Sequence, residues 1–179
     1  WELGDALIGD EGTQKCTLRA LMNFEPGQHP VQWIANIRAE NAAAVSTDPL
    51  EILVIAAASL TLQSAISADR AAPGEQLQLL VLLSNTGSAA AQNTELSFTC
   101  PSSLSIEALS AGETQGAQAE LSIPSIPAGK TFEWRIDLQT GGDFLTGEHT
   151  VSLPIQIQGE GVEGPLELQP QLIVYVAPQ

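Results

Sequence analysis

Two octapeptides that lie 120 positions apart constrain this chain more than any other feature of its sequence. FEPGQHPV (24–31) and FLTGEHTV (144–151) carry Phe, Gly, His and Val at the same four places. The only two histidines of the chain, His29 and His149, stand within them. The pair marks either a histidine site or an internal repeat.

The match extends well beyond the octapeptides when the chain is displaced by 120 positions. Six further pairs keep their apolar, turn or acidic character: Trp1 on Leu121, Leu3 on Ile123, Gly9 on Gly129, Leu18 on Leu138, Ile37 on Ile157 and Glu40 on Glu160. After one inserted residue, three more pairs follow: Pro49 on Pro170, Ile52 on Ile173 and Ala56 on Ala177. Such ordered matching with a single gap is typical of a repeated structural unit.

The repeat predicts how the chain is organised. Residues 58–179 form one complete domain, and residues 1–57 correspond only to the C-terminal half of a sibling domain. The stretch between them, LVIAAASLTLQ (53–63), contains no Pro, Gly or charged residue. We therefore expect a last strand to run almost directly into the next first strand, with restricted motion between the two.

The local pattern predicts β-structure throughout. Short runs rich in β-branched and apolar residues recur along the chain: QLQLLVLLSN (76–85), TELSFTC (94–100), TFEWRIDLQ (131–139), VSLPIQIQG (151–159) and QLIVYV (171–176). Several of them alternate apolar and polar residues, which suits a sheet with one buried face. Turn sequences such as RAAPGEQ, NTGSAA and IPAGK separate them, and no stretch has a sustained helical period. An all-β antiparallel sandwich is predicted.

The repeat also favours a structural role for the histidines and cysteines. Each histidine follows a Gly turn and leads into a strand, without the convergent ligands or acids that a metal or a catalytic base requires. Cys16 and Cys100 stand in or at the end of apolar runs, and Cys16 falls on Ile136 of the later copy. We expect two buried, unlinked thiols, with a disulfide as the alternative.

Charge and motifs exclude several functions. With 21 acidic against 6 basic side chains the net charge is −15, so the surface repels nucleic-acid phosphates and anionic lipids. The chain has no nucleophile elbow and no phosphate-binding loop, and the glycines of GEGVEGP (159–165) belong to a turn sequence, so we predict no enzyme, no catalytic residue, no cofactor and no membrane insertion. GDEG (9–12) and GGD (141–143) lack the spacing of a calcium loop, and we predict no metal residue, although calcium at a domain edge stays open.

The tryptophans supply the one candidate ligand contact. Trp33 falls on Leu153 of the later copy, which predicts a core position. Trp134 falls on Gln14, which predicts an outward, exposed ring on which a sugar could stack. Trp134 is therefore the predicted site residue.

The order of turns and strands resembles a known family. A Pro-Gly turn at 73–74, an Asn-x-Gly turn at 85–87, a strand ending in Pro101 and a Pro-x-Gly turn at 127–129 follow one another. This pattern is similar to the immunoglobulin-like repeats of bacterial and archaeal surface proteins, namely the conserved-repeat modules and their cell-adhesion-related (CARDB-like) relatives. The Cys before Pro101 and the missing first half of the leading copy depart from it. The resemblance implies tandem immunoglobulin-like sandwiches that act as extracellular, cell-surface spacer or adhesive modules without enzymatic activity.

The half-domain raises the question of what covers it, because four strands alone would expose an edge and an apolar face. The missing strands belong to a longer parent, or another chain supplies them, which would make the protein a fibre or filament subunit. The expected partners are other immunoglobulin-like modules of the same or a neighbouring chain. The leading functional hypothesis is a structural or adhesive module. The alternative is a carbohydrate- or protein-binding module that acts through loops at a sandwich end or through Trp134.

Overall fold

The computed structural model describes residues 17, 25–39, 42–160 and 166–178. All regular structure within them is β-strand, so this part of the chain contains no helix that could cross a membrane. The prediction of an all-β fold is confirmed. The strands are, in chain order: β1 (Gly27–Trp33), β2 (Asn36–Ala39), β3 (Ala42–Ser46), β4 (Leu50–Ala56), β5 (Leu60–Ile66), β6 (Arg70–Ala71), β7 (Gln76–Asn85), β8 (Ala91–Thr99), β9 (Leu104–Leu109), β10 (Glu113–Gln115), β11 (Gln118–Ile126), β12 (Thr131–Thr140), β13 (Gly147–Ser152), β14 (Ile155–Glu160), β15 (Leu166–Leu168) and β16 (Gln171–Val176).

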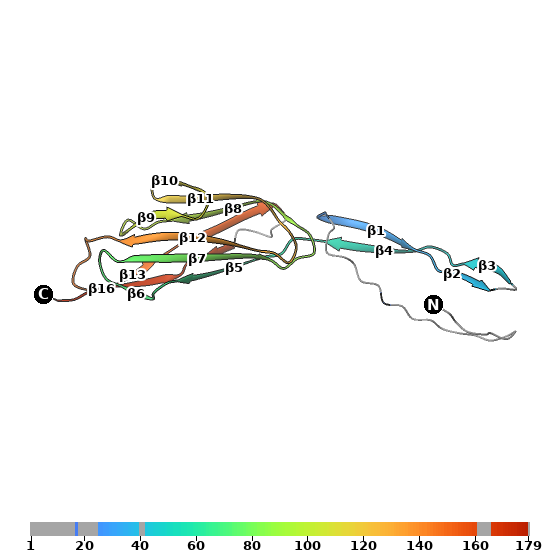
Figure 1. Cartoon of the computed structure of the whole chain (residues 1–179), viewed down its shortest axis with the longest axis horizontal. Coiled ribbons are helices and arrows are strands. Elements are labelled where there is room, and N and C mark those ends of the chain that lie inside the picture. Colours follow the sequence, from blue (N-terminus) through green and yellow to red (C-terminus); the bar gives the residue numbers. More distant parts are fainter. Residues whose placement is uncertain (1–16, 18–24, 40–41, 161–165, 179) are drawn as a thin grey trace.

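Strands β5 to β16 form a sandwich with one core (Figure 1). One sheet has the order β10-β11-β8-β14-β15 and the other the order β5-β7-β12-β9. A third sheet, β13-β16-β6, extends the sandwich, and its β16–β6 pair is parallel, whereas the other pairs among the described strands are antiparallel. Side chains from all three sheets belong to one hydrophobic cluster, which is the core of the module.

Strict alternation explains why these sequences form the sandwich. In β12 the side chains of Trp134, Ile136 and Leu138 are buried, whereas those between them point outward. Because successive residues of a strand face opposite sides, one apolar row enters the core and one polar row meets solvent. Burying each large apolar side chain stabilises the fold by about 1.5 to 3 kcal/mol relative to leaving it exposed. The core is almost wholly aliphatic, as the low aromatic content predicts.

Strands β1 to β4 lie outside this sandwich. β1 pairs with β4 and β2 with β3, each as a two-stranded antiparallel sheet. Figure 1 shows these strands as an extended arm that leaves one end of the sandwich, where β4 continues into β5. Strand β4 ends at Ala56 and β5 begins at Leu60, so the predicted near-continuous passage between the two is confirmed.

Strand pairing repeats between the arm and the sandwich. His29 lies opposite Val54 in β1 and β4, and His149 lies opposite Val174 in β13 and β16. Both members of the second pair stand 120 positions after those of the first. Two segments of different surroundings thus adopt the same register, as an internal repeat requires.

The same register corrects the predicted alignment of the last strand. Ile52 lies opposite Val31, and in the later copy Leu172, not Ile173, lies opposite Val151. Compared with the arm, the later copy does have one residue more between β14 and β15, but it has one residue fewer between β15 and β16, so the two differences cancel. The predicted matches of Ile52 with Ile173 and of its neighbours in β4 are therefore wrong by one position. These matches were predicted because they align identical Pro, Ile and Ala residues. Strand pairing, not residue identity, decides which face of the sheet each residue occupies.

Candidate functional site

The passage from β4 to β5 is held against the sandwich by backbone hydrogen bonds. Residues 57–59 form this link, and they lie against residues 85–89, which are the last residue of β7 and most of its connection to β8 and are called the loop 85–89. The backbone N–H groups of Ser88 and Ala89 donate to the carbonyl oxygen of Ala57 at N–O distances of 2.9 and 3.1 Å. The N–H of Ala57 in turn donates to the Ser88 hydroxyl at 3.2 Å. We call the link and the loop together the joint.

Asn85 fastens the joint from inside. Its buried side chain accepts, through Oδ1, from the backbone N–H groups of Ser59 (3.2 Å) and Gly87 (3.0 Å). Its Nδ2 donates to the carbonyl oxygens of Ala89 and Ile126, both at 2.8 Å. Two donors on one side and two acceptors on the other fix the amide orientation. One side chain therefore ties together three stretches of backbone: the link just before β5, the loop 85–89 and the end of β11.

Gly87 is the point of closest approach in the joint. A Cβ atom at this position would lie 2.3 Å from the carbonyl oxygen of Ala57 and 2.5 Å from the backbone nitrogen of Ser59. Both contacts are with backbone, which cannot turn aside as a flexible side chain does. The sequence marked 85–87 only as a turn, and the need for Gly here comes from the link that packs over it.

The two histidines bridge their own turns. Nε2 of His29 and Nε2 of His149 each lie 2.6 Å from the carbonyl oxygen of the residue four positions earlier. A carbonyl only accepts, so Nε2 carries the proton in both. Gly27 and Gly147 have φ angles of +133° and +124°, which L side chains rarely adopt, and this explains the shared Gly-x-His pattern. Repetition of this contact in both copies supports the predicted structural role.

Cys100 is a buried free thiol, as predicted. Burial raises its pKa from the ordinary value of 9.0 to about 11, because the thiolate is poorly solvated in the core. Cys16 lies outside the described residues.

The raised pKa predicts a loss of stability at alkaline pH. Between pH 9 and 11 the unfolded chain releases a thiol proton that the folded chain keeps. The contribution of the protonated Cys100 thiol to the free energy of unfolding is therefore fully present below pH 9. It falls by about 2 to 3 kcal/mol as the pH approaches 11. Urea unfolding at pH 8.5 and 11 measures this in a Cys16→Ala background. Cys100→Ala in the same background is the control and lacks this part of the loss. Equal losses in both proteins would contradict the assignment.

Trp134 is not an exposed ring, and that prediction is wrong. Its side chain is 0% exposed, and its Nε1–H donates to the carbonyl oxygen of Ala111 at 2.9 Å. The ring packs within the core and offers no face on which a sugar could stack. Trp33, predicted as core, is only partly buried in β1, whereas Leu153 at the equivalent position is fully buried.

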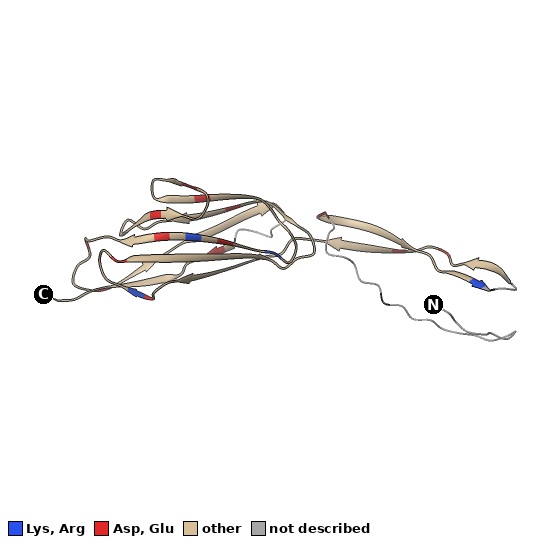
Figure 2. Ribbon diagram, in the orientation of Figure 1, with Lys and Arg blue, Asp and Glu red and all other residues tan. Residues whose placement is uncertain are grey.

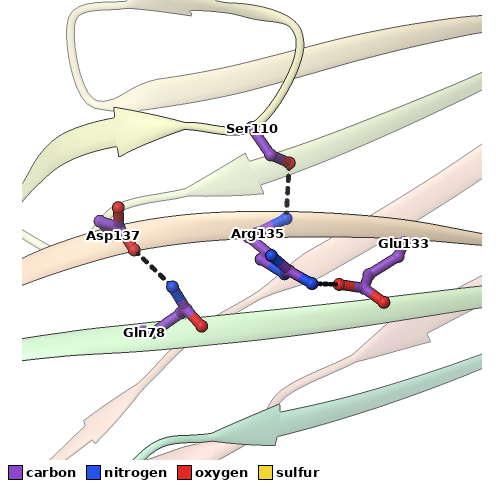
Figure 3. Close-up of polar contacts among 5 residues, drawn as sticks. All are labelled: Gln78, Ser110, Glu133, Arg135 and Asp137. Atoms are coloured by element: carbon purple, nitrogen blue, oxygen red, sulfur yellow. Dashed lines mark hydrogen bonds and ion pairs between the residues drawn. The ribbon is translucent and has the colours of Figure 1, made fainter.

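The outer row of β12 is a solvated polar surface (Figure 3). Asp137 accepts from the amide of Gln78 on the neighbouring strand β7 at 2.9 Å, and Arg135 forms an ion pair with Glu133. The backbone N–H of Arg135 donates to the hydroxyl of Ser110 at 2.9 Å. Exposed pairs of this kind contribute about 0 to 1 kcal/mol. They keep the face soluble and assemble no nucleophile with a base.

No metal centre emerges in the part of the chain that the structure describes. Nowhere among those residues do three His, Cys, Asp or Glu side chains come together in a way that could hold a metal ion. Acidic side chains are spread over both sheets rather than gathered at one point (Figure 2). GGD (141–143) follows β12 as a turn, and GDEG (9–12) lies outside the described residues.

Comparison with known proteins gives similar folds only. No family model matches the chain, and no curated protein does. The 35 kDa C-terminal fragment of the major pilin GBS80 of Streptococcus agalactiae is similar over 66% of this chain and 56% of that fragment, at 6% identity and a TM-score of 0.46. The seventh ScaB type I cohesin from Pseudobacteroides cellulosolvens is similar over 65% of this chain and 94% of the cohesin, at 14% identity and a TM-score of 0.44. The sporulation control protein Spo0M from Bacillus subtilis is similar over 65% of this chain and 49% of that protein, at 14% identity and a TM-score of 0.40. At these identities and TM-scores the likeness assigns the chain to no family and no function.

Proposed function

We propose that the chain is a non-enzymatic spacer segment of an extracellular surface protein, built from tandem sandwiches that the joint holds at a fixed angle. In this proposal residues 58–179 are one complete module, and residues 1–57 are the second half of the module before it. The observation that supports it most is the joint, where a three-residue link makes hydrogen bonds to the loop 85–89.

A short bonded link transmits orientation, whereas a long free linker does not. Flexible linkers of Gly and Ser behave as random coils, and their ends take many relative positions. Here the link 57–59 donates and accepts hydrogen bonds along its length, and Asn85 bonds the start of β5. Successive modules joined in this way form a stiff rod, which suits spacing at a cell surface.

Replacing Gly87 by alanine is expected to open the joint while leaving the sandwich folded. The new Cβ would collide with the backbone of Ala57 and Ser59, so the link must move away from the loop. Amide hydrogen exchange at Ser88 and Ala89, whose N–H groups bond across the joint, should accelerate at least about tenfold.

The matched control is Gly142→Ala. No atom lies within 4 Å of a Cβ built on Gly142, so exchange at the joint should stay as in the parent protein. Rapid exchange of Ser88 and Ala89 already in the parent would show that the joint is open in solution, and the spacer proposal would fail.

The extracellular part of the proposal rests on the acidic, Lys-poor composition together with the family resemblance in the turn pattern. Antibodies against residues 58–179 should label intact, unpermeabilised cells that make the protein. Labelling that appears only after permeabilisation would contradict this location. Expected partners are other sandwich modules of the same or a neighbouring chain. A sugar-binding role has no support from Trp134, since its ring is buried.

A further inference from the structure

The arm exposes an apolar face, whereas the equivalent face in the complete sandwich is covered. Three positions of the arm show this: Val31 is 40% exposed, Ile37 53% and Ile52 39%. Their equivalents by strand register are almost fully buried: Val151 at 7%, Ile157 at 0% and Leu172 at 0%. Together with Trp33 and Val54, which share this side of β1 and β4, these residues are called the open face.

The opposite side of the arm differs in the expected way. Leu53 is 52% exposed, and its equivalent Ile173 is only partly buried in the complete sandwich. Exposure there is therefore ordinary for this fold, whereas exposure of the open face is not. Apolar side chains that are exposed along one side of paired strands mark a contact site.

The complete sandwich shows what kind of segment covers such a face. In the complete sandwich, Val151, Leu172 and Val174 share one core with buried residues of strands that precede residue 121, among them β5, β7 and β8. Strand β7 shows the pattern most clearly, because its buried positions Leu77, Leu79, Val81 and Leu83 are aliphatic and alternate along the strand. A segment with this pattern matches the open face strand for strand.

An exchange of half-modules between copies of this chain cannot cover the face. Each copy contains one segment of the first-half type, residues 58–120, and its own β13 to β16 already occupy that segment. An exchange between two copies would cover one open face by uncovering another. One such face per chain remains in every assembly of this kind.

We propose that the open face binds a first half-module, a segment with the strand pattern of residues 58–120, joined in tandem ahead of residues 1–57 on the same polypeptide. Within 58–179 the strands of residues 58–120 precede those of the second half on one chain, and the proposed tandem organisation places the occupant in the same way. This inference rests on the proposed tandem organisation and identifies the partner of the arm.

The test places a copy of residues 58–120 directly before Trp1, because Trp1 falls on Leu121 in the repeat. Binding of the dye 1-anilinonaphthalene-8-sulfonate and amide exchange of β1 and β4 are compared between the fused and the original chain. The fused chain should be a monomer that has lost the dye signal of the open face, with exchange in β1 and β4 slowed at least about tenfold. Unchanged dye binding and exchange would overturn the inference.

Two variants of the fused chain make the result specific. Ile52→Asp places a charge on the open face and should restore dye binding and rapid exchange, whereas Leu53→Asp, on the opposite side of the same strand, should not. Equal effects of both would overturn the inference. The inference would also be overturned if the fused chain bound a separately added fragment 58–120 in preference to its own fused copy, because that would place the occupant on another chain. Amide exchange at Ser88 and Ala89 reports on the joint independently of the open face. If the fusion experiment failed while these amides stayed protected, the proposed spacer role would remain intact.

Discussion

Replacing Asn85 by alanine is expected to lower the free energy of unfolding of the sandwich by about 3 to 5 kcal/mol, since each buried polar group left without a partner costs about 1 to 3 kcal/mol. The change removes Oδ1, which accepts from the N–H groups of Ser59 and Gly87, and Nδ2, which donates to the carbonyls of Ala89 and Ile126. Relaxation and entering water would recover part of the loss. Urea unfolding followed by circular dichroism measures it.

Asn85→Asp separates the two sides of this contact. The carboxylate has nearly the same shape and keeps the acceptor for Ser59 and Gly87, but it cannot donate to the two carbonyls. We expect this variant to be destabilised as well, because a buried charge then faces two carbonyl oxygens. If either variant unfolded within about 0.5 kcal/mol of the parent, as ordinary surface changes do, Asn85 would not be the fastening point of the joint.

Trp134→Ala is expected to lower the free energy of unfolding by about 3 to 5 kcal/mol, the usual range for truncating a buried aromatic side chain. The ring is fully buried in the core, and its removal leaves a cavity between the sheets. Because typical domains are stable by only about 5 to 15 kcal/mol, this variant should lose a large share of the stability of the sandwich. Thermal and urea unfolding report the change.

Two controls separate packing from surface recognition. Trp134→Phe keeps most of the buried area and loses the hydrogen bond to Ala111, so it should cost less than the alanine variant. Glu133→Ala alters the exposed neighbour and should change stability by about 0.5 kcal/mol or less. A folded, fully stable Trp134→Ala protein would show that the ring is not part of the core.

The fold was largely predictable because its signals are local. Alternation within TFEWRIDLQ and VSLPIQIQ predicts strands with one buried face, and these strands are present as β12 and β13 to β14. Turn glycines were also visible, and Gly74 and Gly129 adopt positive φ angles at the two turns marked by Pro-Gly and Pro-x-Gly. Neither inference needs information from distant parts of the chain.

Trp134 was mispredicted because alignment took precedence over alternation. Its match with Gln14 suggested an outward ring, but within its own strand Trp134 shares a face with Ile136 and Leu138. Alternation of apolar and polar residues along one strand shows directly which side a residue faces, whereas a single aligned pair of residues does not. The local pattern was the better guide.

The joint could not be derived from the sequence. The sequence marks Asn85 only as part of a turn, because its four bonding partners are backbone groups in three separate stretches, at residue 59, at residues 87 and 89, and at residue 126. Backbone groups are present at every residue and leave no trace in amino-acid type. The crowding at Gly87 likewise depends on how the link 57–59 passes over the loop.

The most direct test of the fixed joint is the distance distribution between two spin labels measured by double electron–electron resonance. One label at Ile55, an exposed position next to the end of β4, and one at Glu113 in β10 span the joint, in a background in which both cysteines are alanine. A single narrow distribution that Gly87→Ala broadens and Gly142→Ala leaves unchanged is the expected result. A broad distribution in the unaltered joint would show that the two sides move independently, and the protein could not act as a stiff spacer.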